Sequence, residues 1–263
     1  MTNETPDFTT VTEVPGINAT QSELSQIYTR YRWASDYVEG KKVLELACGS
    51  GPGLGYLKSK GASHVVGTDI EDGNLKYARE YYANRDGIET AIVDAMDLPY
   101  EDGSFDVVIN FEAIYYIPDL VKALKEAHRV LTPGGVFLIS TVNSKWHGFN
   151  PSPFSHEYPP ADRLIELLTA SGFEPEIKLG YVDQPAGIVR RLVGFIRIMA
   201  VKLKLIPDTM KAKEFLKRLF YGELSPVPYE LEDGKYHEEP LSLLTDVRAD
   251  EDKHVFIYAL GKK

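Results

Sequence analysis

Short apolar runs and amphipathic segments alternate along most of the chain. The apolar runs, six or seven residues long, are typical of strands buried in a sheet, and apolar residues spaced every three or four positions predict helices. The predicted strands are Lys42–Ala47, His64–Asp69, Ile88–Val93, Phe105–Asn110, Val136–Thr141, Phe173–Leu179 and His254–Leu260. The predicted helices are Gln21–Tyr37, Gly53–Lys60, Asn74–Ala83, Leu120–Val130 and Ala161–Ala170. This alternation predicts an α/β fold: a doubly wound, seven-stranded, mostly parallel sheet with helices on both faces.

A glycine-rich turn follows the first predicted strand, in the stretch Glu45–Gly53. Glycine allows sharp turns and a close approach of the backbone to a ligand, and open α/β sheets bind ligands at this carboxyl edge. Asp69 ends the second strand, 24 residues after Glu45. There it can accept hydrogen bonds from both hydroxyls of a ribose, or it can simply cap the next helix. Asp94 ends the third strand, where it can receive the exocyclic amine of an adenine.

Taken in order, the motifs between Lys42 and Val142 resemble those of the class I S-adenosylmethionine-dependent methyltransferases, in particular the small-molecule group. The matching motifs are the acidic residue with its glycine loop, Asp69, Asp94-Ala95, Ser104–Val108 and Leu131–Gly135. Ala47 departs from the family, which often has a third glycine at this position. Because alanine is small, we expect a slightly shifted loop with cofactor binding retained.

The resemblance implies S-adenosylmethionine as the cofactor and gives roles to residues around its methionine moiety. Glu45 lies near the amino group, while Ala47 and Gly49 present their backbone to the same moiety. Asn110, at the end of the fourth strand, offers its backbone carbonyl to the methionine ammonium.

The same resemblance implies contacts to the adenosine. Asp69 binds the ribose, Ile70 packs on the adenine, and Asp94 and Ala95 contact its polar edge. The complete set of expected cofactor-binding residues is Tyr28, Arg32, Glu45, Ala47, Gly49, Gly51, Asp69, Ile70, Asp94, Ala95 and Asn110.

The glycine spacing argues against a nicotinamide dinucleotide as the cofactor. That cofactor needs a Gly-x-Gly-x-x-Gly turn for its pyrophosphate. A pattern begun at Gly49 puts Leu54 in the third glycine position, and a pattern begun at Gly51 puts Tyr56 there. Neither register fits.

Four parts of the chain follow from these patterns. Residues 1–40 form an N-terminal arm and a cofactor-covering helix, 41–181 the methyltransferase core, 182–250 a helical cap insertion over the carboxyl edge, and 251–263 the last core strand. In the covering helix, Tyr28 and Arg32 are placed to close over the methionine carboxylate, although core packing of Tyr28 is an equal alternative. The cap contains two long helical patterns, Ile188–Ile206 and Met210–Tyr221.

Charge in the cap suggests an anionic partner. Between Gly187 and Tyr221 there are nine lysines or arginines but only two acidic residues, whereas the whole chain carries a net charge of −10. The first helical pattern also has a continuous apolar face. Such a helix can contact an anionic membrane surface peripherally or bind an anionic substrate. It can equally pack its apolar stripe on the core and leave its basic face in water.

Composition narrows the class of protein further. The acidic balance disfavours nucleic acid as a partner, and nucleobase methylation is also disfavoured because no Pro-Pro-aromatic continuation follows Asn110. The single cysteine, Cys48, excludes an internal disulfide and indicates a reducing compartment. With no signal peptide and no transmembrane pattern, we expect a cytoplasmic protein.

The acceptor is expected over the carboxyl edge, near the loops after the fourth and fifth strands. These loops carry Glu112, Tyr115, Tyr116, His147 and His156. A hydroxyl acceptor needs a base, and His147 is the first catalytic candidate because imidazole titrates near neutrality. Alternatively, it is an ordinary loop histidine. Glu112 is the second candidate, able to orient an amine. No metal-ligand spacing is present.

Three classes of function remain in view. The leading one is methyl transfer to an oxygen or nitrogen of a small-molecule acceptor, such as a sugar, a glycolipid intermediate or a natural product. The second is a nicotinamide-dependent oxidoreductase, which cofactor titrations would distinguish. The third is a catalytically silent S-adenosylmethionine-binding or membrane-docking protein, which a turnover assay would distinguish.

Overall fold

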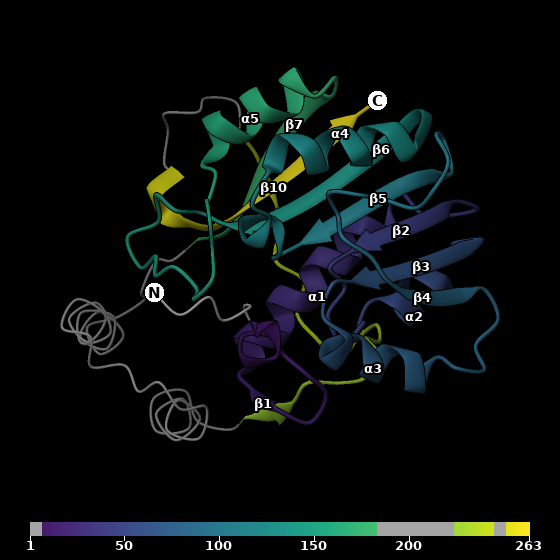
Figure 1. Ribbon diagram of the computed structural model, residues 1–263. Coiled ribbons are helices and arrows are strands. Elements are labelled where there is room, and N and C mark those ends of the chain that lie inside the picture. Colours follow the sequence, from purple (N-terminus) through teal and green to yellow (C-terminus); the bar gives the residue numbers. More distant parts are fainter. Residues whose placement is uncertain (1–6, 183–223, 245–250) are drawn as a thin grey trace.

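The computed structural model describes residues 7–182, 224–244 and 251–263 (Figure 1). Within these residues, the largest sheet has eight strands in the order β4-β3-β2-β5-β6-β10-β7-β9. The strands are β2 (Lys42–Leu46), β3 (His64–Asp69), β4 (Ile88–Ile92), β5 (Phe105–Phe111), β6 (Leu131–Val142), β7 (Glu174–Val182), β9 (Ser242–Leu243) and β10 (His254–Lys262). The five neighbouring strands β4, β3, β2, β5 and β6 run parallel. Strand β10 is antiparallel to both β6 and β7. The doubly wound, mostly parallel fold is confirmed, and β9 adds a two-residue edge strand to the seven predicted ones.

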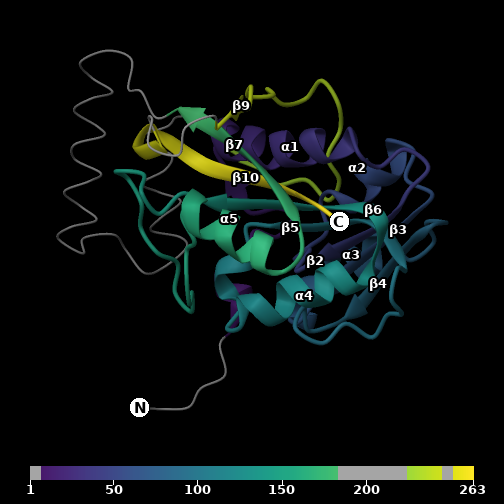
Figure 2. The same cartoon turned by 90° about the horizontal axis from the view of Figure 1, so that it is seen from above.

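Helices cover both faces of this sheet (Figure 2). They are α1 (Gln21–Ser35), α2 (Leu54–Ser59), α3 (Asp72–Tyr81), α4 (Leu120–Val130) and α5 (Ala161–Ala170). Successive side chains of a strand point to opposite faces, so Val43 packs with α1, α2 and α3, while Leu44 packs with α4 and α5. The result is two cores, one on each side of the sheet.

Helix α1 has a defined start. The Glu23 backbone N–H donates to Thr20 Oγ1 at 3.1 Å, and the Glu23 side chain accepts from the Thr20 backbone N–H at 2.8 Å. This capping box satisfies two backbone donors that a helix N-terminus leaves without partners. It fixes the point at which the chain turns from the N-terminal arm, residues 7–20, into α1.

Strand β6 begins earlier than the sequence pattern suggests. The run Thr132 to Gly135 predicts a break after α4, yet β6 starts at Leu131. The C-terminus accounts for the difference, because Gly134 N–H donates to the Lys263 carbonyl at 3.1 Å and Lys263 N–H donates to the Gly135 carbonyl at 3.0 Å. Backbone pairing with the C-terminus therefore continues the strand through the two glycines, although Gly134 keeps a left-handed φ of 79°.

Residues 224–244, here called the strap, cross the outer side of α1 and α2. Strand β8 (Ser225–Pro226) in the strap pairs with β1 (Asn18–Ala19) in the arm. Arg85, which follows α3, forms two hydrogen bonds with Glu230, at 2.6 and 3.0 Å. The strap therefore ties the N-terminal arm to the helices on one face of the sheet.

The rest of the predicted cap, including both helical patterns and all nine basic residues between Gly187 and Tyr221, lies outside the described residues. In the parts of the chain that are described, no helix combines the length and apolarity needed to cross a bilayer.

Candidate functional site

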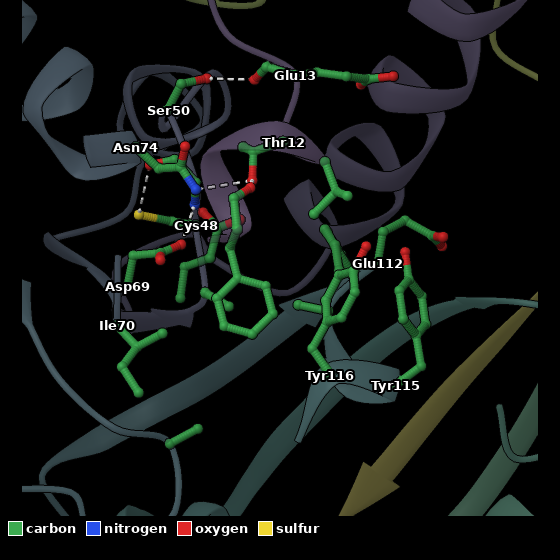
Figure 3. A pocket seen from close by; sticks show the side chains of 18 of the residues that line it. Thr12, Glu13, Cys48, Ser50, Asp69, Ile70, Asn74, Glu112, Tyr115 and Tyr116 are labelled. Atoms are coloured by element: carbon green, nitrogen blue, oxygen red, sulfur yellow. Dashed lines mark hydrogen bonds between the residues drawn. The ribbon is translucent and has the colours of Figure 1, made fainter. Parts of the chain in front are cut away.

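A cavity of about 590 Å³ lies at the carboxyl edge of the parallel strands (Figure 3). Its floor is formed by the ends of β2, β3, β4 and β5, and α1 and the N-terminal arm close over it. In the view of Figure 3, Asp69 and Ile70 lie on one side, and Glu112, Tyr115 and Tyr116 lie on the other. Eight of the thirteen predicted site residues line this cavity: Glu45, Ala47, Gly49, Asp69, Ile70, Asp94, Ala95 and Glu112.

Asp69 lies at the end of β3 with its side chain almost fully buried. Gly49 N–H donates to Oδ2 at 2.8 Å and Glu71 N–H donates to Oδ1 at 2.8 Å. Burial raises the pKa of this carboxyl, while the two backbone hydrogen bonds act to lower it. Because a carboxylate has about four acceptor positions, each oxygen can accept another hydrogen bond. Asp69 can therefore bind two neighbouring hydroxyls on a ligand.

The glycine loop after β2 uses backbone conformations that side chains disfavour. Ala47 has φ = 55°, next to Gly49 at 57° and Gly51 at 71°. This explains why a glycine suits position 47, since a left-handed conformation costs a residue with a Cβ about 1–2 kcal/mol. Ala47 nevertheless adopts it, and the loop retains its sharp turn.

Glu45 forms part of the floor beneath this loop. Tyr31 Oη donates to Glu45 Oε1 at 2.5 Å, while Oε2 is buried and has no hydrogen-bond partner within residues 7–182, 224–244 and 251–263. Burial raises the pKa of Glu45 to about 8. A buried polar atom without a partner is costly, so a ligand that donates a hydrogen bond here would relieve that cost.

An apolar surface continues from Asp69 toward the end of β4. Ile70 lines the cavity and has 55% of its surface exposed, so its aliphatic side chain is open to contact with a ligand. Asp94 and Ala95 lie across from it, and Asp94 Oδ1 accepts a hydrogen bond from Met96 N–H at 2.8 Å. This part of the cavity combines an aliphatic face with a carboxylate, which suits a flat heterocycle carrying an amine.

The N-terminal arm forms the roof. Asn74 Nδ2 donates to Thr12 Oγ1 at 2.8 Å, and Ser50 Oγ donates to the Glu13 carbonyl at 3.0 Å. Phe8, in the 3₁₀-helix η1 (Phe8–Thr10), meets Tyr116 edge to face across the cavity, with ring centroids 5.3 Å apart. The pattern of the sequence placed an arm here, but not these contacts.

Helix α1 presents a different face to the cavity from the one expected. Ile27, Arg30 and Tyr31 line it. Tyr28 Oη instead donates to Asp233 of the strap at 3.0 Å, and Arg32 pairs on the surface with Asp36 and Glu238. Residues 27, 30 and 31 share one side of a helix, so the prediction chose the neighbouring side.

Glu112 follows β5 at the other end of the cavity, with φ = 54°. Ser140 Oγ donates to Glu112 Oε1 at 3.0 Å, and Arg30 Nε lies 3.9 Å from the same oxygen. Burial raises the pKa of Glu112, while Arg30, Ser140 and Tyr115 act to lower it. A left-handed glutamate costs about 1–3 kcal/mol, so the surrounding structure must hold this carboxyl in place.

The remaining predicted residues lie apart from the cavity. His147 is exposed in the loop after β6, and it is His156, whose backbone N–H donates to the Tyr115 carbonyl at 2.7 Å, that lines the cavity. Asn110 donates from Nδ2 to the Leu46 carbonyl at 3.2 Å on the opposite face of the sheet, beside α4. Gly51 packs against Leu54 and Ala78. Among the described residues, no group of three or more metal-binding side chains gathers.

Comparison with known proteins gives a consistent family. Residues 44–139 match the sequence model of the methyltransferase domain family. A Mycolicibacterium smegmatis protein described as a probable S-adenosylmethionine-dependent methyltransferase is 36% identical over 147 residues, which are 54% of this chain and 55% of that protein. A fatty-acid O-methyltransferase of the same organism is 37% identical over 110 residues, 41% of this chain and 40% of that enzyme. The chain therefore spans about half the length of the curated relatives it matches.

A solved structure shows the same fold over most of the chain. A Thermotoga maritima S-adenosylmethionine-dependent methyltransferase, described as a possible histamine N-methyltransferase, superposes with a TM-score of 0.58. The match covers 92% of this chain and 91% of that one at 16% identity, so it concerns the fold alone.

Proposed function

This chain carries a class I S-adenosylmethionine-dependent methyltransferase domain, and from this premise we propose that the protein transfers a methyl group from S-adenosylmethionine to an oxygen or nitrogen of a small molecule. One observation carries the proposal. A single cavity joins the predicted cofactor residues Glu45, Asp69 and Ile70 to a second group of polar side chains around Glu112. A two-substrate transfer needs both parts in one enclosed space.

The residues of the first part fit S-adenosylmethionine. Glu45 Oε2 is a buried acceptor without a partner in the described part of the chain, which suits the methionine ammonium. Asp69 has acceptor positions left for the two ribose hydroxyls, and Ile70 offers an apolar face to the adenine. The loop from Ala47 to Gly49 brings backbone, not bulky side chains, to the methionine moiety.

Bound S-adenosylmethionine supplies a methyl group on a positively charged sulfur, which is already activated for displacement. The protein's residues then have to position the acceptor in line and exclude water. Thr12 and Phe8 of the arm close the roof, while Tyr115, Tyr116 and Phe111 provide an aromatic wall for the acceptor. A lipid or other largely apolar small molecule fits this wall, and a glycolipid intermediate, a sugar or a natural product belongs to the same proposal.

The test separates this function from its alternatives. Titration calorimetry with S-adenosylmethionine, S-adenosylhomocysteine and NAD is expected to give micromolar dissociation constants for the first two and no heat for NAD. Formation of S-adenosylhomocysteine is then measured with a panel of alcohols, phenols, amines and fatty acids. NAD binding without S-adenosylmethionine binding would indicate an oxidoreductase. Cofactor binding with no turnover across the panel would indicate a silent binding protein.

A further inference from the structure

Two charged side chains lie together at the acceptor end of the cavity. Arg30 Nε and Glu112 Oε1 are 3.9 Å apart, and the two side chains are only 13% and 15% exposed. The Arg30 guanidinium also lies over the Phe256 ring, 5.1 Å from its centroid. Both groups line the cavity, so a bound acceptor meets a cation and a carboxylate side by side.

This pair is incompletely satisfied. Arg30 Nε is buried and has no hydrogen-bond partner among the residues that the structure describes, because 3.9 Å to Glu112 is an ion pair without a hydrogen bond. Ser140 and Tyr115 hold the Glu112 carboxyl, which lines the cavity from a residue with a left-handed backbone. The Glu112 carboxylate can therefore accept a proton and the Arg30 guanidinium can donate a hydrogen bond, and one small functional group of a ligand can reach both.

The chemistry of this pair distinguishes among acceptors. A carboxylate would bring a second anion against Glu112, and an alkylamine, which is protonated near pH 7, would bring a second cation against Arg30 and would have to lose its proton before it could react, each at a cost in a poorly hydrated site. A hydroxyl both donates and accepts hydrogen bonds, so it can donate to Glu112 and accept from the guanidinium. Building on the proposed methyl transfer, we infer that the acceptor is an uncharged hydroxyl, an alcohol or phenol, and that Glu112 is the general base that removes its proton.

The transfer then balances as follows. The hydroxyl oxygen forms the new C–O bond to the methyl carbon, and the C–S bond breaks with its electron pair staying on sulfur. The hydroxyl proton passes to a Glu112 oxygen and afterwards to solvent. The sulfonium becomes a neutral thioether and the acceptor becomes a methyl ether, so no other reactant is needed. Arg30 does not take the proton, and it acts as a positioning residue.

The surroundings of Glu112 act on the pKa of its carboxyl in opposite directions. Its burial raises its pKa from the ordinary value of 4.5, and the cation of Arg30 on α1 limits that rise. The other groups that face it are Ser140 on β6, Tyr115 and Tyr116 on the 3₁₀-helix η2 (Ile114–Tyr116), Tyr158, and Tyr258 on β10. These groups are neutral near pH 7, whereas Arg30 is charged. Arg30 also interacts electrostatically with Glu13 of the arm, which lines the same cavity.

Binding of matched probes tests the acceptor class without turnover. The protein saturated with S-adenosylhomocysteine is titrated with 4-butylphenol, 4-butylbenzoate and 4-propylbenzylamine. We expect the phenol to bind at least tenfold more tightly than the other two. Glu112→Gln should lower the affinity for the phenol about tenfold, because one charge-assisted contact is lost. The control Glu166→Gln, at an exposed position on α5, should change nothing. Equal affinities, no binding by any probe, or an unchanged preference in Glu112→Gln would overturn the inference.

Turnover of the phenol provides the second readout. Glu112→Gln should lower kcat about 10²–10⁴-fold and remove the acidic limb of the rate–pH profile. Arg30→Met should move that limb to higher pH, because the carboxyl loses the cation that lowers its pKa, and Arg30→Lys should move it back. A profile that keeps its acidic limb in Glu112→Gln would contradict the role of base. Binding of S-adenosylhomocysteine, measured first in every variant, separates these outcomes from a failure of the proposed function.

Discussion

Tyr31 Oη donates a 2.5 Å hydrogen bond to Glu45 Oε1 at the floor of the cavity, while the second oxygen of the same carboxylate has no partner among the described residues. The tyrosine comes from α1 and the glutamate from β2, so this contact joins the covering helix to the sheet. It also leaves one buried acceptor oxygen on a residue that lines the cavity. We therefore expect Glu45 to lower the stability of the ligand-free protein and to raise its affinity for the ligand.

Glu45→Gln should stabilise the ligand-free protein at alkaline pH. The folded-state pKa is raised from 4.5 to about 8, so folding takes up a proton between these values and stability falls as the pH rises through them. Glu45→Gln has no such titrating group. Its free energy of unfolding in urea should equal that of the unsubstituted protein at pH 4.5, and it should exceed that value by the largest amount above pH 8. Its affinity for S-adenosylhomocysteine should fall. Glu89→Gln, 69% exposed, is the control for removing one carboxylate. The same advantage at both pH values would argue against this account.

Asp69→Asn should weaken the binding of S-adenosylhomocysteine by roughly 1.5–3 kcal/mol, the usual size of a hydrogen bond to a charged group. Asp69 has free acceptor positions toward the cavity, whereas Asp72, three residues later, forms a surface ion pair with Arg79 at 2.7 Å. Asp72→Asn is therefore the matched control in calorimetry. Equal affinities of the two variants would mean that Asp69 does not hold the ribose.

Gly51→Ala should destabilise the fold more than Gly134→Ala. Both glycines have positive φ, 71° and 79°. A Cβ on Gly51 would lie 2.7 Å from the Ala78 Cβ, whereas one on Gly134 would meet nothing within 4 Å. We expect a loss of about 1 kcal/mol at Gly134 from backbone strain alone and about 3 kcal/mol at Gly51, where overpacking adds to it. Similar unfolding midpoints for the two variants would show that the loop relaxes around the added methyl group.

Asp233→Ala should loosen the strap. Tyr28 Oη and Tyr56 Oη donate to Asp233 Oδ1 at 3.0 and 2.9 Å, and Lys60 pairs with its other oxygen. Because the carboxyl is half exposed, we expect a loss of only about 1 kcal/mol, together with faster proteolysis within residues 224–244.

Two comparisons check that reading of the strap. Lys60 and the tyrosines lower the pKa of Asp233, so the stability difference should be present above pH 4 and shrink below it. Glu232→Ala removes a 60% exposed carboxylate whose ion pair in the described structure is with Lys235, also in the strap, and it should leave proteolysis unchanged. Equal proteolysis of the two variants would show that Asp233 does not anchor the strap.

The alternation of apolar runs and amphipathic segments determined the order of strands and helices. His64–Asp69, Leu120–Val130 and Ala161–Ala170 were predicted with the bounds the structure shows. Asp69 and Asp94 could be assigned to the site because the end of a parallel strand always faces the same edge of the sheet. The basic segment between Gly187 and Tyr221 lies outside the described residues. Its contact with a membrane or an anionic substrate therefore stays a prediction.

What the sequence could not determine depends on contacts between distant segments. Periodicity places Tyr28 and Tyr31 on one amphipathic helix, but only its packing against β2 turns Arg30 and Tyr31 toward the cavity and leaves Tyr28 to Asp233, 205 residues away. His147 and His156 are equivalent in a loop without a local pattern, and the contact of His156 with Tyr115 separates them. Local sequence fixes strands and helices through backbone preference and spacing. The side chains that share a cavity are decided by long-range packing, which no local pattern records.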